Sequence, residues 1–159
     1  MPLTFNIRHL EEKDVLLQGE LGPDDLELED WDELIHARQP LRYDLRAQRL
    51  GQAILVQGRL EMALDCECAR CLKPFQHKIQ LDPWTAHLPL EGPEKAAIKD
   101  DLADLTPYIR EDILLEFPQH PLCGTDCGGL PDRAKENKTK GAGRTEGSSA
   151  WSELNKLKF

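Results

Sequence analysis

A strict two-residue alternation from Ala53 to Cys66 constrains the fold of this chain more than any other feature of its sequence. Successive side chains of a β-strand point to opposite faces of a sheet, so an alternation of this length predicts a half-buried strand. The second face, from Ala53 to Asp65, is mixed and more polar. The apolar face consists of Ile54, Val56, Gly58, Leu60, Met62, Leu64 and Cys66.

The segments on either side of this strand favour an antiparallel sheet. A turn at residues 50–52 is expected to join it to a preceding strand at Tyr43–Arg49. Residues Phe75–Leu81 alternate again, which predicts a second half-buried strand, and Trp84–Leu88 is a candidate for a further one. Cys68–Cys71 therefore lies at or near the tip of an antiparallel hairpin.

A helix is expected to cover one face of this sheet. Thr106 can cap its N-terminus, and Pro107 at the first helical position loses no N–H that the helix needs. Pro118 is expected to end the run, because proline cannot continue a helix. The apolar side chains that share one helical face are Ile109, Ile113, Leu114 and Phe117.

The N-terminal region, residues 1–40, gives weaker signals. Leu3–Ile7 and Val15–Leu21 are candidate short strands. Asp24–Ile35 is expected to be a helix or another strand, with its acidic residues on a solvated face. Glu91–Asp101 is expected to be a charged loop.

The C-terminal part of the sequence changes character at Asp132. Residues 132–150 hold no apolar side chain larger than Ala, so they cannot bury enough surface to offset the entropy of ordering, and disorder is expected. Residues 151–159 regain an amphipathic pattern. We expect a domain at 1–131, a flexible basic linker at 132–150 and a C-terminal amphipathic segment at 151–159. The fold class is α+β: an antiparallel sheet or partly closed barrel with one or two covering helices, a disordered polar segment and a short C-terminal helix.

Charge is unevenly distributed along the 159 residues, whose net charge is −9. Seven Lys/Arg and four Asp/Glu give residues 132–159 a charge of +3, which leaves −12 for residues 1–131. An acidic body does not attract nucleic acid, because phosphate contacts come from Lys and Arg. Its electrostatic field favours basic partners instead. The candidate partner-binding residues are Arg70, Arg133, Lys135, Lys138, Lys140 and Arg144.

The compartment is expected to be the cytoplasm. The N-terminal sequence has neither the basic nor the apolar region of a secretory signal, and no apolar run approaches the length of a membrane span, so no membrane association is expected. Thiols stay reduced there, which favours metal binding or redox chemistry over structural disulfides.

The five cysteines fall into two groups, Cys66–Cys71 and Cys123–Cys127. Cys68 and Cys71 have the spacing with which a tight turn binds one ion, and a second pair would complete a tetrahedral Zn²⁺ shell. A redox pair and small buried hydrophobic residues are the competing interpretations. Cys66 continues the apolar face of its strand and is expected in the core. His120 is a weaker candidate ligand and fits better as a loop residue.

Catalytic patterns are not found. The sequence contains no nucleophile elbow, phosphate-binding loop, dinucleotide fingerprint or zinc-protease motif. A four-cysteine zinc site is closed to water and substrate, so a zinc ion bound there is expected to be structural. We therefore expect a protein that is not an enzyme and has no small-molecule substrate.

Two ordered motifs resemble the YceD-like family. The first motif is GRLEMALDCECARCLKPF, and the second is DLADLTPYIREDILLEFPQHPLC. The terminal WSELNKLK also looks like the closing segment of that family. In the first motif the matching residues are Gly58, Leu60, Cys68, Arg70, Cys71, Leu72, Pro74 and Phe75. In the second they are Asp101, Asp104, Leu105, Pro107, Glu111, Pro118, Pro121, Leu122 and Cys123.

This resemblance implies a non-enzymatic bacterial factor of ribosome biogenesis, needed for accumulation of large-subunit (23S) ribosomal RNA, with an α+β fold. Its expected partners are a ribosomal RNA precursor, a basic ribosomal protein, or both. Many members carry further cysteines after the position of Cys127, where this chain continues instead into its polar tail. Any zinc site here must therefore join Cys123 and Cys127 to Cys68 and Cys71.

Two other functions remain open on the sequence alone. One is a zinc-stabilised protein-interaction module without a ribosomal role, which would bind metal but ignore ribosomal particles. The other is a thiol-redox enzyme that uses Cys68 and Cys71, which requires a lowered thiol pKa and turnover of a dithiol substrate.

Overall fold

The computed structural model describes residues 2–29, 31–125 and 127–129, which belong to one compact unit, Met1–Gly129. The linker and amphipathic segment expected at 132–150 and 151–159 lie outside the described residues. The same holds for the candidate partner-binding residues Arg133, Lys135, Lys138, Lys140 and Arg144.

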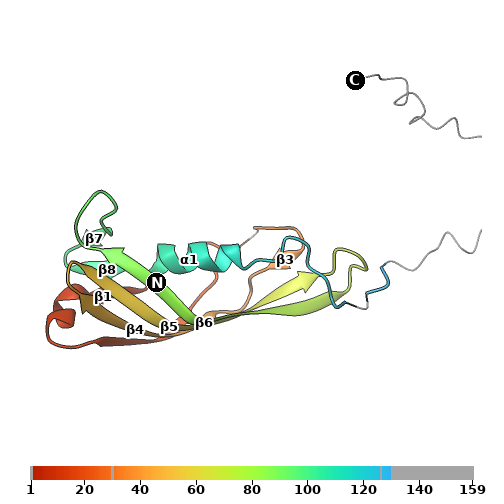
Figure 1. The fold of residues 1–159 in the computed structure, drawn as a ribbon. Helices are drawn as coiled ribbons and strands as arrows, with labels where there is room; N and C mark the ends of the chain where they lie inside the picture. The colour runs from red at the N-terminus through yellow and green to blue at the C-terminus, as the bar shows by residue number, and fades with distance from the viewer. Residues whose placement is uncertain (1, 30, 126, 130–159) are drawn as a thin grey trace, which may run out of the picture. The chain divides into compact units, whose positions relative to one another are not determined.

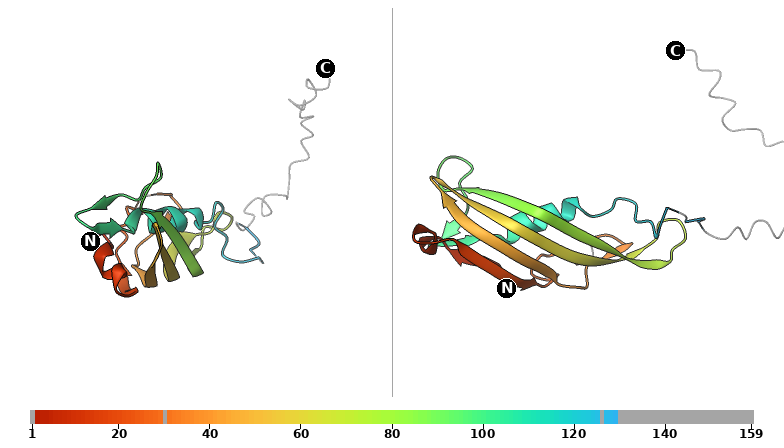
Figure 2. Two further views of the ribbon diagram at one scale, coloured as in Figure 1. Left: turned by 60° about the vertical axis from the view of Figure 1, so that its left-hand side comes forward. Right: turned by 60° about the horizontal axis from the view of Figure 1, so that its bottom comes forward.

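The main sheet is antiparallel and is organised around one long strand, β5 (Ala53–Glu67). On one side β5 pairs along its length with β6 (Pro74–Pro89). On the other side it pairs first with β4 (Leu41–Leu50) and, near its end, with the short β3 (Ile35–His36). β2 (Val15–Leu21) pairs with β4 and completes the sheet, which is curled like half of a barrel (Figures 1 and 2).

A second, smaller sheet and one α-helix complete the described fold. β1 (Thr4–Asn6), β8 (Leu102–Asp104) and β7 (Ile98–Lys99) pair in the order β1-β8-β7. A 3-10 helix, η1 (Ile7–Glu11), follows β1, and α1 (Thr106–Leu115) lies against one face of the main sheet (Figure 1). The expected α+β class and antiparallel sheet are confirmed.

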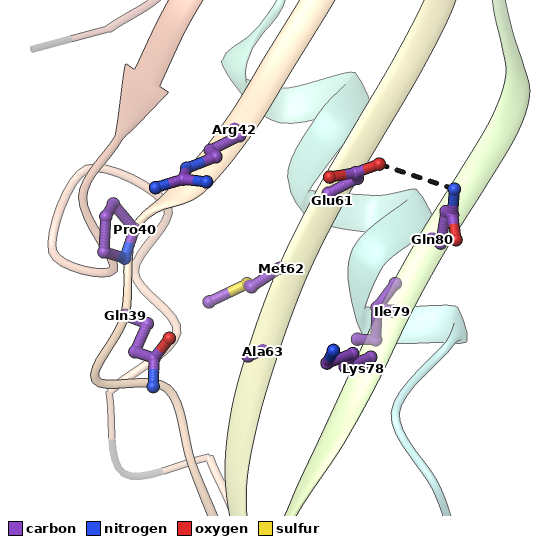
Figure 3. Close-up of a pocket in the computed structure, with 9 residues that line it drawn as sticks. All are labelled: Gln39, Pro40, Arg42, Glu61, Met62, Ala63, Lys78, Ile79 and Gln80. Atoms are coloured by element: carbon purple, nitrogen blue, oxygen red, sulfur yellow. Dashed lines mark hydrogen bonds between the residues drawn. The ribbon is translucent and has the colours of Figure 1, made fainter.

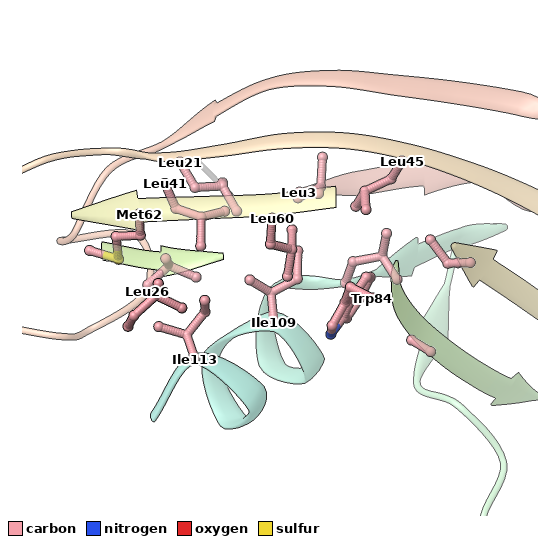
Figure 4. Close-up of a cluster of buried hydrophobic side chains, with 14 of the residues drawn as sticks. Leu3, Leu21, Leu26, Leu41, Leu45, Leu60, Met62, Trp84, Ile109 and Ile113 are labelled. Atoms are coloured by element: carbon pink, nitrogen blue, oxygen red, sulfur yellow. The ribbon is translucent and has the colours of Figure 1, made fainter. Parts of the chain in front are cut away.

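The alternation in β5 determines which face of the sheet is covered. Its even-numbered side chains from Ile54 to Cys66 are buried, apart from the glycine at 58, whereas Gln57 and Arg59 on the other face are exposed. Ile109 and Ile113 of α1, both fully buried, pack against this face together with Leu60 and Trp84 (Figure 4). The strand and the apolar helix face predicted from the sequence are therefore confirmed.

The strand expected separately at Trp84–Leu88 is instead the second half of β6. A bulge interrupts the register with β5 between Gly58 and Leu60, where Asp82 and Pro83 stand opposite a single residue. The extra residue reverses the phase of the alternation, so Ile79 and Trp84 both point into the core although one number is odd and the other even. A Cβ at residue 58 would lie 2.0 Å from the Asp44 carbonyl oxygen, so glycine is required there.

The expected cap of α1 is wrong in its detail. Leu105 occupies the N-cap position, and no side chain caps the helix. The Thr106 hydroxyl instead accepts a hydrogen bond of 2.8 Å from the Leu3 N–H, which fastens the N-terminal segment to the start of the helix. The Thr106 N–H donates to the Asp104 carboxylate at 2.8 Å.

Three further expectations are corrected by the structure. The described residues of the expected helix or strand Asp24–Ile35 form neither: residues 24–29 and 31–34 make a turn-rich loop in which Leu26 and Leu28 are fully buried, and Ile35 begins the two-residue β3. Only residues 4–6 of the expected strand Leu3–Ile7 pair, because η1 begins at Ile7. The charged loop expected at Glu91–Asp101 contains β7, which returns to β8 through a turn at Asp100 and Asp101.

Candidate metal centre

The hairpin between β5 and β6 places the first two candidate ligands. The Cys68 N–H donates to the Lys73 carbonyl at 2.9 Å, which closes the loop at the end of the strands. The Cys68 carbonyl accepts from the Leu72 N–H at 2.8 Å, and Leu72 has a positive φ of 62°. This tight turn brings the Cys71 side chain back toward Cys68, as the two-residue spacing predicts.

The loop that follows α1 brings the second pair to the same place. The Pro121 carbonyl accepts a 2.7 Å hydrogen bond from the Ala69 N–H, so the main chains of the loop and the hairpin are joined directly. In Figure 1 the segment after α1 runs beside the tip between β5 and β6. Cys127 turns back through its N–H, which donates to the Gly124 carbonyl at 3.3 Å.

Four sulfur atoms converge where the two loops meet. The Sγ atoms of Cys68, Cys71, Cys123 and Cys127 all lie within 4.8 Å of one another. Cys68 Sγ is 3.5 Å from Cys127 Sγ, and Cys71 Sγ is 3.6 Å from Cys123 Sγ. Cys68 is buried, Cys71 and Cys127 are partly buried, and Cys123 is exposed.

These distances fit a tetrahedral metal ion. A Zn–S bond of about 2.3 Å places the sulfurs of a tetrahedral shell about 3.8 Å apart, which agrees with the two short separations. Thiolates are the ligands that Zn²⁺ prefers in structural sites. The structure thus brings together the four cysteines that the sequence predicts as ligands, and they could hold a metal ion.

The surroundings of Cys68 stabilise a negative charge on its sulfur. The backbone N–H of Cys71 lowers the pKa of Cys68 to about 5, and the N–H groups of Cys123 and Arg70 and the Cys127 thiol act in the same direction. Burial of the sulfur opposes this shift. In contrast, hydrogen bonds from its thiol, first to Cys127 and then to Cys71, raise the pKa of Cys123 to about 12. A metal-free cluster therefore loses the Cys68 proton easily and holds the Cys123 proton firmly, and a divalent cation would compete for the Cys123 proton.

Cys66, two residues before the cluster, is not part of it. Its side chain is 2% exposed and lies in the hydrophobic core, opposite Ile35 and Phe75 in the sheet. Burial and the charge of Asp65 raise the pKa of Cys66, which keeps it a neutral thiol. The expectation that Cys66 is a core residue is confirmed.

The remaining sequence candidates lie around the cluster. His120 is exposed and is not among the residues whose ligand atoms converge. Arg70 is exposed at the hairpin tip, between two of the cysteines, so its side chain is accessible to a partner.

A separate concavity of about 460 Å³ opens on the sheet face away from α1 (Figure 3). It forms between β3 and β4, which both pair with β5. Ile35 is paired with Cys66 and Arg42 with Glu61, so the β3–β4 connection is two residues longer than the stretch of β5 that it faces. The concavity was not predicted from the sequence. The one signal of the break between β3 and β4 is Pro40, which has no N–H to donate to a sheet ladder. The lining residues of the concavity are Gln39, Pro40, Arg42, Glu61, Met62, Ala63, Lys78, Ile79 and Gln80.

Two of the charged side chains at this concavity have polar partners on the sheet surface. Arg42 lies 2.9 Å from Glu20, and Glu61 accepts a 3.4 Å hydrogen bond from Gln80 (Figure 3). Ion pairs of this kind, half exposed on a sheet surface, are typical of a solvated face rather than of a ligand site. The four-cysteine cluster is the stronger candidate functional site.

The fold and the cluster together define a curled antiparallel-sheet protein in which a hairpin and a post-helix loop share a four-cysteine site. The family model for "Large ribosomal RNA subunit accumulation protein YceD" matches residues 56–158, which include most of β5, all of α1 and both cysteine loops. The chain belongs to the YceD family.

Relatives of the chain include uncharacterized proteins from mycobacteria. Those of Mycobacterium bovis and Mycobacterium tuberculosis are 32% identical over 99 residues, which is 57% of this chain and 47% of theirs. One from Mycobacterium leprae is 28% identical over 99 residues, or 46% of its length. The matched part thus spans less than half of each relative. No solved structure was found to match the chain. Among the residues that the structure describes, no helix is long and apolar enough to cross a membrane.

Proposed function

We propose that this chain is a non-enzymatic, cytoplasmic factor that supports accumulation of large-subunit (23S) ribosomal RNA by binding a precursor of the large ribosomal subunit. The observation that carries the proposal is membership of the YceD family, whose name refers to this role and whose model spans both cysteine loops. The proposed mode of action is binding, because a closed shell of four thiolates leaves no position for a substrate.

The four cysteines support this proposal if they hold a structural Zn²⁺. A shell of four thiolates leaves no position open for water or substrate, so the ion would supply stability rather than catalysis. Cys68 and Cys71 would hold it from the hairpin, and Cys123 and Cys127 from the post-helix loop. The metal would fix α1 and its following loop to the end of the sheet and present Arg70 on a rigid tip.

The binding mode follows from the distribution of charge. The loop at residues 22–34 is rich in acidic side chains and lies beside α1, where Glu27 is 3.5 Å from Arg110. This acidic surface suits a basic ribosomal protein, whose Lys and Arg would be attracted to it. The cations of the linker suit RNA phosphates instead: Arg133, Lys135, Lys138, Lys140 and Arg144.

Co-sedimentation with large-subunit precursors tests the proposal. The full-length protein should travel with these particles at low salt, and deletion of residues 132–150 should weaken the association. A matched variant that replaces the five cations of the linker with Gln keeps its length and should weaken it as much, because charge is the cause. If the full-length protein never co-sediments, the ribosomal function is wrong.

Separate variants distinguish RNA from protein as the partner. Replacing Asp24, Glu27, Asp32 and Glu33 by their amides should reduce binding to a basic ribosomal protein and leave binding to RNA unchanged. The Gln-substituted linker should show the opposite pattern, with a smaller dependence of RNA affinity on salt. If neither set of variants changes binding, the charge-based assignment of partners is wrong.

A further inference from the structure

Two close sulfur pairs of the cluster each join the two loops. Cys68 Sγ and Cys127 Sγ are 3.5 Å apart, and Cys71 Sγ and Cys123 Sγ are 3.6 Å apart. In each pair one sulfur belongs to the hairpin and the other to the post-helix loop. A disulfide bond is about 2.05 Å long, so each pair needs to close by roughly 1.5 Å.

The main chain already holds the loops in position for such bonds. The hydrogen bond from the Ala69 N–H to the Pro121 carbonyl, 2.7 Å, joins the loops beside both sulfur pairs. Bonds between the loops would close chain segments with sequence separations of 59 and 52 residues. They would restrict the unfolded chain more than bonds within the short Cys68–Cys71 or Cys123–Cys127 segments, and would therefore stabilise the fold more.

Exposure sets the order in which the thiols would react. Cys123 is exposed and Cys71 is partly exposed, so a small oxidant reaches this pair first. Cys127 is partly buried and Cys68 is buried, so the second pair becomes accessible later. Cys66 is enclosed in the core and has no thiol of the cluster beside it.

We propose that the four-cysteine cluster is a site of oxidative modification. A peroxide-class oxidant converts it into two disulfides between the loops, Cys71–Cys123 and Cys68–Cys127, and any bound metal ion is released. Cys66 stays reduced. The inference rests on the sulfur geometry and applies to the metal-free chain as well as to the metal-bound chain of the proposed function.

The chemistry balances with hydrogen peroxide as the oxidant. A thiolate of the exposed pair attacks the peroxide, the O–O bond breaks, and a sulfenic acid and hydroxide form; the hydroxide takes a proton and leaves as water. The partner thiol then attacks the sulfenic sulfur, which forms the S–S bond and releases a second water. Each disulfide uses one peroxide and two electrons from the two sulfurs, and the second pair repeats the same steps.

The two states differ in charge but not in connectivity. Four thiolates around a divalent cation carry a net charge of −2, whereas two disulfides carry none. The link between hairpin and loop is kept, so the surface beside Arg70 becomes less negative without release of the loop. Oxidation would thus change how this tip interacts with a charged partner while the fold persists.

Thiol counting and peptide mapping of the full chain test the inference. The reduced protein, with and without bound Zn²⁺, is treated with hydrogen peroxide, and its free thiols are then alkylated. The count of free thiols should fall from five to one. In the metal-bound sample, one Zn²⁺ per chain should appear in solution, as a colorimetric chelator would report.

Protease cleavage between the cysteines can show which of the four are joined by disulfide bonds. Trypsin cuts after Arg70 and separates Cys68 from Cys71, and a protease that cuts before Asp126 separates Cys123 from Cys127. Mass spectrometry should then find Cys68 joined to Cys127 and Cys71 joined to Cys123. Disulfides within the segments, a crosslink to Cys66, or thiol loss as sulfinic acid without crosslinks would each overturn the inference.

A paired variant keeps the test meaningful if substitutions change stability. Replacing Cys71 and Cys123 together by Ser leaves three thiols, of which two should be lost to the Cys68–Cys127 bond. The thiol count should therefore fall from three to one. A count that stays at three shows that the buried pair does not oxidise, which contradicts the inference. Neither result bears on co-sedimentation with ribosomal precursors, so the proposed function stands or falls separately.

Discussion

The two hairpins of the central strand β5 close in different ways. The β4–β5 turn is local: Gly51 adopts a φ of 59°, and a Cβ placed there would meet nothing within 4 Å. The β5–β6 tip depends on a distant segment, because its Ala69 N–H bonds to Pro121 and its two cysteines face Cys123 and Cys127. A local turn can be changed at a small cost, whereas the tip couples the sheet to α1 and the loop that follows.

Removal of the metal should have the largest effect on this contrast. If Zn²⁺ occupies the cluster, free metal at a thousandfold its dissociation constant stabilises the folded chain by about 4 kcal/mol. A chelator should lower the thermal midpoint accordingly and increase hydrogen exchange at the β5–β6 tip, with little change at the β4–β5 turn. Cys66→Ala is the matched control and should still bind one equivalent of metal. Metal-free wild type after purification without chelator would contradict the zinc assignment.

Substitution of Gly58 should rank second. Its Cβ would lie 2.0 Å from the Asp44 carbonyl oxygen and 2.8 Å from Leu45 Cα, so Gly58→Ala forces β4 and β5 apart at the bulge. We expect a loss of about 3 kcal/mol in the free energy of unfolding, measured by denaturant titration. A loss below that of Gly51→Ala would show that the bulge adapts freely.

Gly51→Ala should have a smaller effect and serves as the counterpart of Gly58→Ala. No atom obstructs the new methyl group, so the cost is only that of a left-handed conformation in an L-residue, about 1–2 kcal/mol. Gly51→Asn should recover part of it, since Asn tolerates this conformation better. Metal binding should be unchanged in both variants, because the turn is independent of the cysteine tip.

The pH dependence of the metal-free chain should be the weakest effect, because three of the four sulfurs are at least partly exposed and solvent screens their charges. The pKa of Cys68 is lowered to about 5 from the ordinary thiol value of 9.0, so its contribution to stability is complete above pH 9 and is lost as the pH falls toward 5. The pKa of Cys123 is raised to about 12, so its contribution is complete below pH 9 and is lost as the pH rises toward 12. Thermal midpoints should therefore peak near pH 9, and Cys68→Ser should flatten the acidic side. A profile that is flat in the wild type would contradict both assignments.

The difference between the hairpins also explains what the sequence could predict. Alternation along β5 and the turn at Gly51 depend on neighbouring residues, so both were readable without a structure. The bulge was not, because the phase of β6 after Asp82 depends on how its residues stand against Gly58. The concavity at Pro40 was missed for the same reason: the extra residues are visible only against the partner strand.

The candidate site was predictable in its composition but not in its assembly. The spacing of Cys68 and Cys71 indicates a chelating turn, and the missing later cysteines required a joint site with Cys123 and Cys127. Whether the pairs meet depends on the path of the chain after α1, which the Ala69–Pro121 bond fixes. The lowered pKa of Cys68 arises mainly from backbone N–H groups, and a redox enzyme would also require such a shift. Cys68 is buried, however, which shields its sulfur from a protein substrate.

The bond between the Leu3 N–H and the Thr106 hydroxyl has a consequence for the order in which the chain folds as it is made. These residues are 103 positions apart, and β1 pairs with β8 alone among the described strands. At a synthesis rate of about 5–20 residues per second, the first strand waits roughly 5–20 s for its partner to be translated. The small sheet therefore forms after the strands β2, β4, β5 and β6 have all been made, although its strand β1 is synthesised before them.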